Sequence, residues 1–191
     1  MSNLTFGKEK KRFNFDIIRT VLVWAFQIAV VCTIAFVLVW YFGQRVSNIG
    51  DSMKPVLSNG DVTLVNRIVY NASRPKRNDI IVFKPNGNEN SHFYIKRIIG
   101  LPGETIEMKD GAIYIDQKKL KEEFKTTKLD DVGIVTEAMT LGGNEYFVLG
   151  DNRKSSEDSR MADIGNVKND EIYGKAWFVI SPGARFGFIK K

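Results

Sequence analysis

The chain has 191 residues, a formal net charge of +6, one histidine and one cysteine. This length allows one membrane anchor and one domain of ordinary size. One histidine, together with one cysteine inside an apolar stretch, cannot build an ordinary zinc site with nitrogen and sulfur ligands. No glycine-rich phosphate loop follows a strand, so no nucleotide site is predicted. We therefore expect neither a metal nor a cofactor.

The positive charge is concentrated at the N-terminus. Residues 1–20 hold five basic and two acidic side chains, which is +3 of the total +6. The other +3 is spread over residues 21–191, where no long basic run occurs. Because nucleic-acid binding needs a concentrated basic face, we do not expect a nucleic-acid partner.

Residues 21–43 contain no charged side chain. As a helix these 23 residues would measure roughly 35 Å, enough to cross a hydrocarbon core of about 30 Å. Trp24 lies near one end and Trp40 near the other, as in the aromatic belts of membrane helices. A cleaved secretory signal would have a shorter apolar part and a small-x-small cleavage site, and no such site follows Phe42. A retained transmembrane helix is therefore predicted.

Basic residues next to this span predict its orientation. Five precede it and two follow it within a similar length: Lys8, Lys10, Lys11, Arg12 and Arg19 against Arg45 and Lys54. Because loops rich in Lys and Arg stay in the cytoplasm, residues 1–20 are predicted to be cytoplasmic. Residues 44–191 are predicted to form a domain on the extracytoplasmic side of the cell membrane.

After the span, short alternating or apolar runs bounded by turn residues predict a mainly β domain. The predicted strands are residues 61–66, 79–84, 92–99, 105–109, 112–116, 146–149 and 176–180. Asn86-Gly87 lies in the loop of one predicted hairpin, and Asp110-Gly111 is a strong two-residue turn signal for a second. Residues 117–141 are highly charged and weakly patterned, so we expect a solvated excursion from the sheet. The predicted fold is an antiparallel β-sheet domain preceded by one transmembrane helix.

Ser52 and Lys96 are the residues that could support nucleophilic catalysis. Ser52, nine residues after the apolar span, could also be an ordinary turn or cap residue. Lys96 lies on a predicted strand, on the same face as Tyr94 and Ile98. Its ammonium group could simply reach water, as most strand lysines do. The residues alone leave both interpretations open.

A catalytic Lys96 would have to be buried. An ordinary lysine has a pKa near 10.4 and is protonated at neutral pH, so it cannot accept a proton. Removal from water disfavours the ammonium form and lowers the pKa by up to several units. A neutral Lys96 amine could then take the proton of the Ser52 hydroxyl and later protonate the leaving amine.

Four segments in order resemble the conserved boxes of type I signal peptidases, membrane-bound enzymes that remove signal peptides from exported preproteins. They are residues 50–57 (GDSMKPVL), 59–66 (NGDVTLVN), 94–104 (YIKRIIGLPGE) and 150–160 (GDNRKSSEDSR). The resemblance extends from the apolar span to the closing Gly174-Lys175-Ala176 and Ser181-Pro182 segments. One box is weak evidence, but four in this order after an N-terminal apolar span are specific.

The resemblance implies roles for individual residues. Ser52 would be the nucleophile, Lys96 the general base, and Ser156 the hydroxyl that orients the lysine. The backbone N–H of Ser52 would be an oxyanion donor, a kind of group typically worth about 10²–10³ in rate. Met53 and Pro55 would shape the nucleophile turn. The supporting charged residues would be Asp151 with Arg97 and Asp158 with Arg160.

The chain departs from the family pattern at two places. Some relatives carry a serine hydroxyl that joins the oxyanion hole, and here that position is Gly50. Val56 stands where a threonine is usual. Lys96 occupies the position that holds a histidine in the endoplasmic-reticulum branch, which favours a bacterial type of enzyme, and His92 receives no role.

The function that the resemblance implies is a Ser/Lys endopeptidase that cleaves after small residues at positions −3 and −1 of a signal peptide. Its partners would be signal-peptide-bearing preproteins and the lipid bilayer, and we expect it to act near the secretion machinery. Two alternatives remain at this point. One is a catalytically silent, membrane-tethered binding protein with the same fold, and the other is a self-cleaving Ser/Lys peptidase.

Overall fold

The computed structural model describes residues 15–135, 137–181 and 186–189. The basic residues Lys8 to Arg12, on which much of the predicted orientation depends, lie outside these ranges. The described chain forms two compact units, which comprise residues up to Leu38 and residues from Val39 onward.

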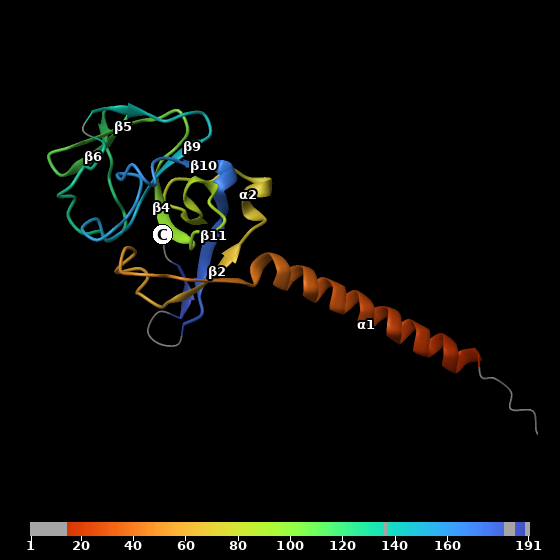
Figure 1. Cartoon of the computed structure of the whole chain (residues 1–191). Coiled ribbons are helices and arrows are strands. Elements are labelled where there is room, and N and C mark those ends of the chain that lie inside the picture. Colours follow the sequence, from red (N-terminus) through yellow and green to blue (C-terminus); the bar gives the residue numbers. More distant parts are fainter. Residues whose placement is uncertain (1–14, 136, 182–185, 190–191) are drawn as a thin grey trace, which may run out of the picture. The chain divides into compact units, whose positions relative to one another are not determined.

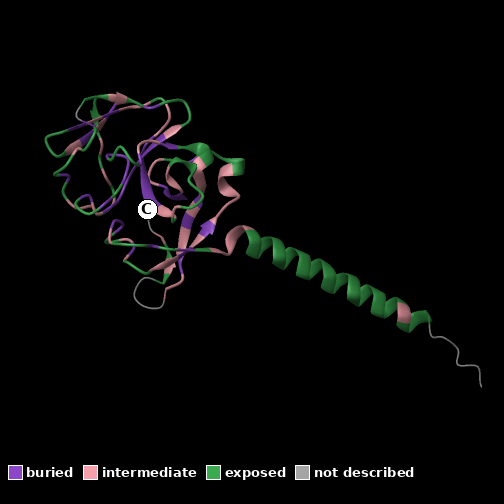
Figure 2. Cartoon of the chain, viewed as in Figure 1, coloured by how far each residue is buried: buried purple, intermediate pink, exposed green. Residues whose placement is uncertain are grey.

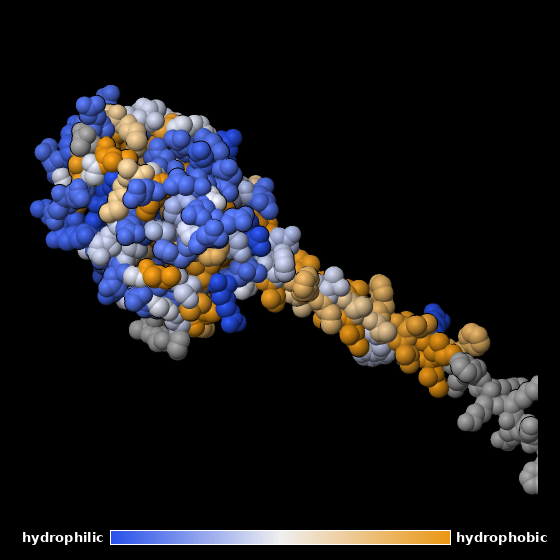
Figure 3. All heavy atoms as spheres, viewed as in Figure 1, coloured by the Kyte–Doolittle hydropathy of each residue, from blue (hydrophilic) through white to orange (hydrophobic). Residues whose placement is uncertain are grey.

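The first unit consists of the helix α1 (Phe15–Phe42), which continues into the second unit (Figure 1). Its 28 residues correspond to about 42 Å, and it begins six residues before the predicted span at Val21 because Asp16 and Arg19 are compatible with helix. Its large apolar side chains are exposed, and hydrophobic residues predominate on the face shown in Figure 3. Among the described helices, α1 has the length and composition needed to cross a membrane.

The second unit is built on an antiparallel sheet with the strand order β1-β2-β11-β3-β4-β9-β10, and β12 also pairs with β11. The strands are β1 (Gln44–Ser47), β2 (Val62–Asn66), β3 (Ile80–Phe83), β4 (Tyr94–Gly100), β9 (Glu145–Leu149), β10 (Val167–Lys168), β11 (Ile172–Val179) and β12 (Gly187–Phe188). The short helix α2 (Val69–Ala72) follows β2, and two 3₁₀ turns span Pro85–Gly87 and Asn169–Glu171. The mainly β fold predicted from the sequence is confirmed.

A smaller antiparallel sheet has the order β7-β6-β5-β8. Its strands are β5 (Thr105–Lys109), β6 (Ala112–Ile115), β7 (Lys118–Lys119) and β8 (Met139–Thr140). Asp110 and Gly111 join β5 to β6 with φ values of 51° and 70°, as a type I′ hairpin turn requires. The predicted hairpin is therefore confirmed, as is the hairpin of β3 and β4.

β4 is a central strand that is buried on both of its faces (Figure 2). It pairs with β3 on one side and with β9 on the other. The strand begins at Tyr94, two residues later than predicted, so His92 precedes it. Because successive side chains point to opposite faces, Lys96 and Arg97 enter two different buried environments.

The prediction that residues 117–141 form a solvated excursion is wrong for the middle of this segment. Leu129 and Val135 are 6% and 1% exposed, and they belong to a core cluster with Ile99, Phe147 and Leu149. The charged residues alternate irregularly with apolar ones, and most of the apolar side chains pack against this cluster. The segment thus covers part of the core, with its charged groups facing out.

Candidate active site

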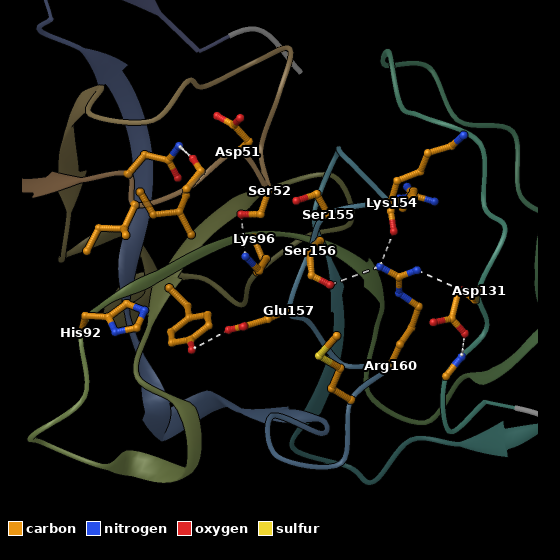
Figure 4. Close-up of a pocket in the computed structure, with 18 of the residues that line it drawn as sticks. Asp51, Ser52, His92, Lys96, Asp131, Lys154, Ser155, Ser156, Glu157 and Arg160 are labelled. Carbon is orange, nitrogen blue, oxygen red and sulfur yellow. Dashed lines mark hydrogen bonds between the residues drawn. The ribbon is translucent and has the colours of Figure 1, made fainter.

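The side chains of Ser52 and Lys96 meet in a pocket of the second unit (Figure 4). Lys96 Nζ donates a hydrogen bond of 2.7 Å to Ser52 Oγ. Ser52 is 8% exposed and Lys96 is 3% exposed. The fold thus brings together two residues that are 44 positions apart in the chain. The alternative in which Lys96 reaches bulk water does not hold in this structure.

Burial changes the proton affinity of Lys96. Loss of hydration lowers the pKa of its amine from 10.5 to about 8, although the nearby carboxylates of Asp158 and Glu157 favour the charged form. A lysine with this pKa is partly neutral near pH 8, whereas an ordinary lysine is almost fully charged there. The site therefore contains an amine that can accept a proton under mild conditions.

The loop that carries Ser52 is held from both sides. Met53 is fully buried in the core, and Leu57 donates its backbone N–H to the carbonyl oxygen of Met53 at 2.9 Å, whereas Pro55 is exposed. Asn152 donates its backbone N–H to the carbonyl oxygen of Ser52 at 2.9 Å. These contacts fix the backbone on both sides of the nucleophile candidate.

Gly50 has a conformational role in this loop. Its φ of +80° lies in the left-handed region, which glycine adopts without the steric cost of a Cβ. The backbone N–H of Gly50 donates to Asn59 Oδ1 at 2.9 Å. This position lacks the side-chain hydroxyl that some relatives carry, so backbone donors such as the N–H of Ser52 remain for an oxyanion.

Two buried ion pairs stabilise residues 150–160. One joins this segment to β4, and the other joins two residues within the segment. Arg97 donates from Nε and Nη2 to the two carboxylate oxygens of Asp151, each at 2.8 Å, and neither side chain is exposed. Arg160 donates from Nε and Nη2 to Asp158 at 2.8 and 2.9 Å. Charge-assisted bidentate pairs of this kind fix geometry strongly. The structure brings these four residues together in the pairs expected from the sequence.

Ser156 lines the same pocket as Ser52 and Lys96. It is 7% exposed, and its Oγ has no hydrogen-bond partner among the described residues. The expected hydrogen bond from Ser156 to Lys96 is therefore not made in this structure. A Cβ at Gly150 would lie 2.2 Å from Ser156 Oγ and 2.5 Å from the carbonyl oxygen of Ser52. The absence of a side chain at Gly150 thus lets these two segments approach.

The pocket measures about 820 Å³, and Ser52 and Lys96 are both part of its lining. One wall is formed by the start of β4 and by His92, whose ring stacks on Tyr94 with 4.6 Å between centroids. Tyr94 donates its hydroxyl to Glu157 Oε2 at 3.1 Å. The other wall consists of residues 130–133 and 153–161, apart from Val132, Asp158 and Ser159. An extended peptide can enter such an open cleft.

Sequence reasoning missed several residues of this site. Asn152 and Glu157 lie inside the fourth box, but their contacts depend on the tertiary fold. Asp131 lies in the segment that was expected to be solvated, and its carbonyl oxygen accepts a hydrogen bond of 2.9 Å from Arg160 Nη1. Its proximity to the fourth box had no sequence signal, because nothing local specifies a contact across 29 residues.

Comparison with known proteins identifies the family. The profile of the family described as "Signal peptidase, peptidase S26" matches residues 21–181. The chain belongs to this family. A signal peptidase I P of Bacillus subtilis subsp. natto is 33% identical over 184 residues, which cover 93% of this chain and 95% of that protein. Signal peptidase I of Bacillus caldolyticus is 38% identical over 178 residues, covering 86% and 93%.

A crystal structure of a signal peptidase I from Enterococcus faecalis V583 is also similar. It is 36% identical in sequence, covers 54% of this chain and 97% of that chain, and superposes with a TM-score of 0.43. Membership of the signal peptidase family makes this protein a serine peptidase.

Proposed function

We propose that this signal peptidase family member is a membrane-anchored endopeptidase that removes signal peptides from exported preproteins with Ser52 and Lys96. The observation that carries the proposal is the 2.7 Å hydrogen bond between Lys96 Nζ and Ser52 Oγ inside an open cleft. The family match and the relatives named signal peptidase I support the substrate class.

The geometry supports a two-step acyl transfer. When Lys96 is neutral, its amine accepts the Ser52 hydroxyl proton while Oγ attacks the scissile carbonyl carbon. The resulting ammonium then gives that proton to the leaving amine, and the mature protein departs. Lys96 next takes a proton from a water molecule, which attacks the acyl group. The Lys96 ammonium then returns this proton to Ser52 Oγ as the signal peptide leaves, which regenerates the free hydroxyl and the neutral amine. The backbone N–H of Ser52 is our proposed donor to the oxyanion.

A membrane anchor suits this substrate. The nine residues from Gly43 to Ser52 span at most about 30 Å, so Ser52 stays near the surface where a signal peptide leaves the bilayer. We propose that residues 21–43 span the membrane, that residues 1–20 are cytoplasmic and that residues 44–191 lie outside. This placement keeps the domain near the secretion machinery. The family resemblance implies that small residues fill the −1 and −3 positions of the substrate.

The proposed base predicts how the rate depends on pH. The neutral form of Lys96 is the active form, and its pKa is lowered to about 8. The turnover rate should therefore rise about tenfold per pH unit well below pH 8 and level off above it. Steady-state cleavage of a preprotein between pH 6 and 10 measures this profile. A rate that is flat from pH 6 to 9 would assign the proton transfer to another group.

Lys54 offers a control for the identity of the base. It lies two residues from Ser52, but its exposed amine pairs with Asp51 at 2.9 Å. Exposed ion pairs contribute about 0–1 kcal/mol to folding stability, so Lys54→Ala should leave the fold of the site intact. The cleavage rate should therefore stay within about twofold of wild type. A loss as large as that of Lys96→Ala, measured in the same assay, would reverse the assignment of the base.

The proposed function is tested with detergent-solubilised full-length protein and a preprotein that carries an Ala-x-Ala site. We expect cleavage after the final alanine and a strong loss when that alanine is replaced by phenylalanine. Mass spectrometry of both products locates the cut bond. Absence of cleavage by a folded, anchored protein would favour the silent binding protein. Cleavage confined to the enzyme's own chain would favour the self-cleaving peptidase.

A further inference from the structure

Residues 122–134 are joined to residues 150–160 by an ion pair and several hydrogen bonds. We call residues 122–134 the strap and residues 150–160 the catalytic loop. Asp131 of the strap and Arg160 of the catalytic loop lie side by side at the edge of the pocket (Figure 4). The strap lies outside the four boxes that carry the family resemblance. Its contacts nevertheless lead to the backbone of Ser52.

The two ends of the strap are tied to arginines of the catalytic loop. At one end, Glu122 forms an ion pair with Arg153, whose side chain is 1% exposed and whose Nε donates to the carbonyl oxygen of Gly150 at 3.0 Å. At the other end, Arg160 Nη1 donates to the carbonyl oxygen of Asp131, and the backbone N–H of Ile134 donates to the carbonyl oxygen of Arg160 at 2.9 Å.

Packing at Gly133 and Leu129 keeps the strap close to the loop. Gly133 has a φ of +56°, and a Cβ there would lie 2.2 Å from the carbonyl oxygen of Arg160. No side chain larger than hydrogen fits at that contact without movement of the backbone. Leu129 is buried in the core cluster. The strap is therefore fixed both to the core and to the catalytic loop.

The middle of the strap reaches the nucleophile through one side chain. Thr127 donates its backbone N–H to the carbonyl oxygen of Asp151 at 3.1 Å, and its hydroxyl donates to Asn152 Oδ1 at 3.2 Å. The same hydroxyl accepts a longer contact of 3.4 Å from the backbone N–H of Lys154. Asn152 in turn donates from its backbone N–H to the carbonyl oxygen of Ser52 and from Nδ2 to that of Asp51 at 3.2 Å.

We propose that the strap positions the nucleophile, with Thr127 as a positioning residue that acts through Asn152 on the backbone of Ser52. This inference rests on the proposed function of Ser52. The Thr127 hydroxyl orients the Asn152 amide, because the oxygen of that amide is held by Thr127 while its nitrogen is directed to the nucleophile turn. The orientation of Ser52 Oγ relative to Lys96 follows from the position of that turn.

Loss of the Thr127 hydroxyl should change turnover more than substrate binding. Thr127 is not part of the lining of the pocket that contains Ser52 and Lys96, so we do not expect a substrate bound in that pocket to touch it. Misplacement of reacting groups by about 1 Å costs up to about 10²-fold in rate. Since the backbone contacts of Asn152 remain, we expect Thr127→Val to lower kcat about tenfold while KM stays within about twofold.

The matched variants are Thr127→Ser, which keeps the hydroxyl, and Thr140→Val, which removes a hydroxyl outside the strap. The Thr140 hydroxyl is hydrogen-bonded to that of Thr105 at 3.0 Å in the smaller sheet. We expect Thr127→Ser to recover most of the lost kcat and Thr140→Val to behave as wild type. Full-length proteins in detergent are compared by preprotein cleavage. An equal loss of kcat in Thr127→Ser and Thr127→Val would overturn the role of the hydroxyl.

A second readout does not depend on activity. Hydrogen exchange of the backbone amide of Asn152, which donates to the carbonyl oxygen of Ser52, should be about tenfold faster in Thr127→Val than in wild type. The measurement is made in the Ser52→Ala background as well, where cleavage plays no part. Unchanged exchange and unchanged kcat in Thr127→Val would overturn the strap proposal alone. Failure of the wild-type enzyme to cleave would instead overturn the proposed function.

If valine at position 127 unfolds the protein, Thr127→Ala replaces it in both comparisons. The two residue types remove the same hydroxyl with different steric demands. A thermal unfolding curve for each variant decides which is used. Agreement of the kcat loss with the increase in Asn152 exchange supports positioning, whereas a kcat loss without any change at Asn152 contradicts it.

Discussion

Ser52→Ala is expected to lower the rate of preprotein cleavage by about 10⁴-fold or more, the scale seen when a serine peptidase loses its nucleophile. Ser52 Oγ is the hydroxyl that Lys96 Nζ contacts, at 2.7 Å. Alanine is smaller and fits the same buried turn, so the fold should be retained. Cleavage of a preprotein by the purified variant measures the loss, and thermal unfolding checks that the domain is intact.

Ser58→Ala is the matched control for this variant. Ser58 lies on the same loop, six residues after Ser52, but does not line the pocket. The Ser58→Ala enzyme should cleave the preprotein at nearly the wild-type rate. A Ser52→Ala enzyme that retained more than about a hundredth of the wild-type rate would rule out Ser52 as the nucleophile, because a hydroxyl-free side chain cannot form the acyl intermediate.

Asp151→Ala is expected to destabilise the folded domain by about 3–5 kcal/mol, because it leaves the Arg97 guanidinium buried without its counter-charge. Both side chains of this pair are fully buried, and two hydrogen bonds of 2.8 Å join them. Denaturant unfolding of the full-length protein in detergent measures the free energy difference. The same variant should lose activity, since Asp151 precedes the residue that contacts the Ser52 backbone.

Two further variants test whether the unpaired buried charge causes the loss of stability in Asp151→Ala. Removing both charges, in Arg97→Met with Asp151→Leu, should recover a large part of the stability, because no unpaired buried charge remains. Asp51→Ala removes an exposed partner of Lys54 and should cost no more than about 1 kcal/mol. A double variant as unstable as Asp151→Ala would mean that shape, and not buried charge, sets the cost.

The sequence was sufficient to predict those elements that local pattern determines. The Asp110-Gly111 turn between alternating runs predicts the β5–β6 hairpin because two consecutive positive φ values favour these residue types. The 23 uncharged residues before Ser52 predict a helix from their length and composition alone. The residues alone left the pairing of Ser52 with Lys96 open, because no local signal connects residues that lie on different strands and loops, and the family resemblance favoured it.

The parts that could not be predicted depend on contacts between distant segments. Leu129 and Val135 are too widely spaced among charged residues to show a strand or helix period, yet the fold buries both. The burial of Lys96 follows from the central position of β4 between β3 and β9, which strand patterns do not reveal. The hydrogen bond expected at Ser156 is not formed here, because rotamers within a pocket depend on all its walls.

The most direct test of the Ser52–Lys96 mechanism compares wild type with Lys96→Ala in detergent, on a preprotein with an Ala-x-Ala site, at a pH above 8. The side chains around Lys96 remain the same, so loss of the amine removes the proton acceptor that contacts Ser52. We predict cleavage after the final alanine by wild type, and a rate about 10⁴-fold lower for a folded Lys96→Ala enzyme. Cleavage by Lys96→Ala at close to the wild-type rate would contradict the mechanism.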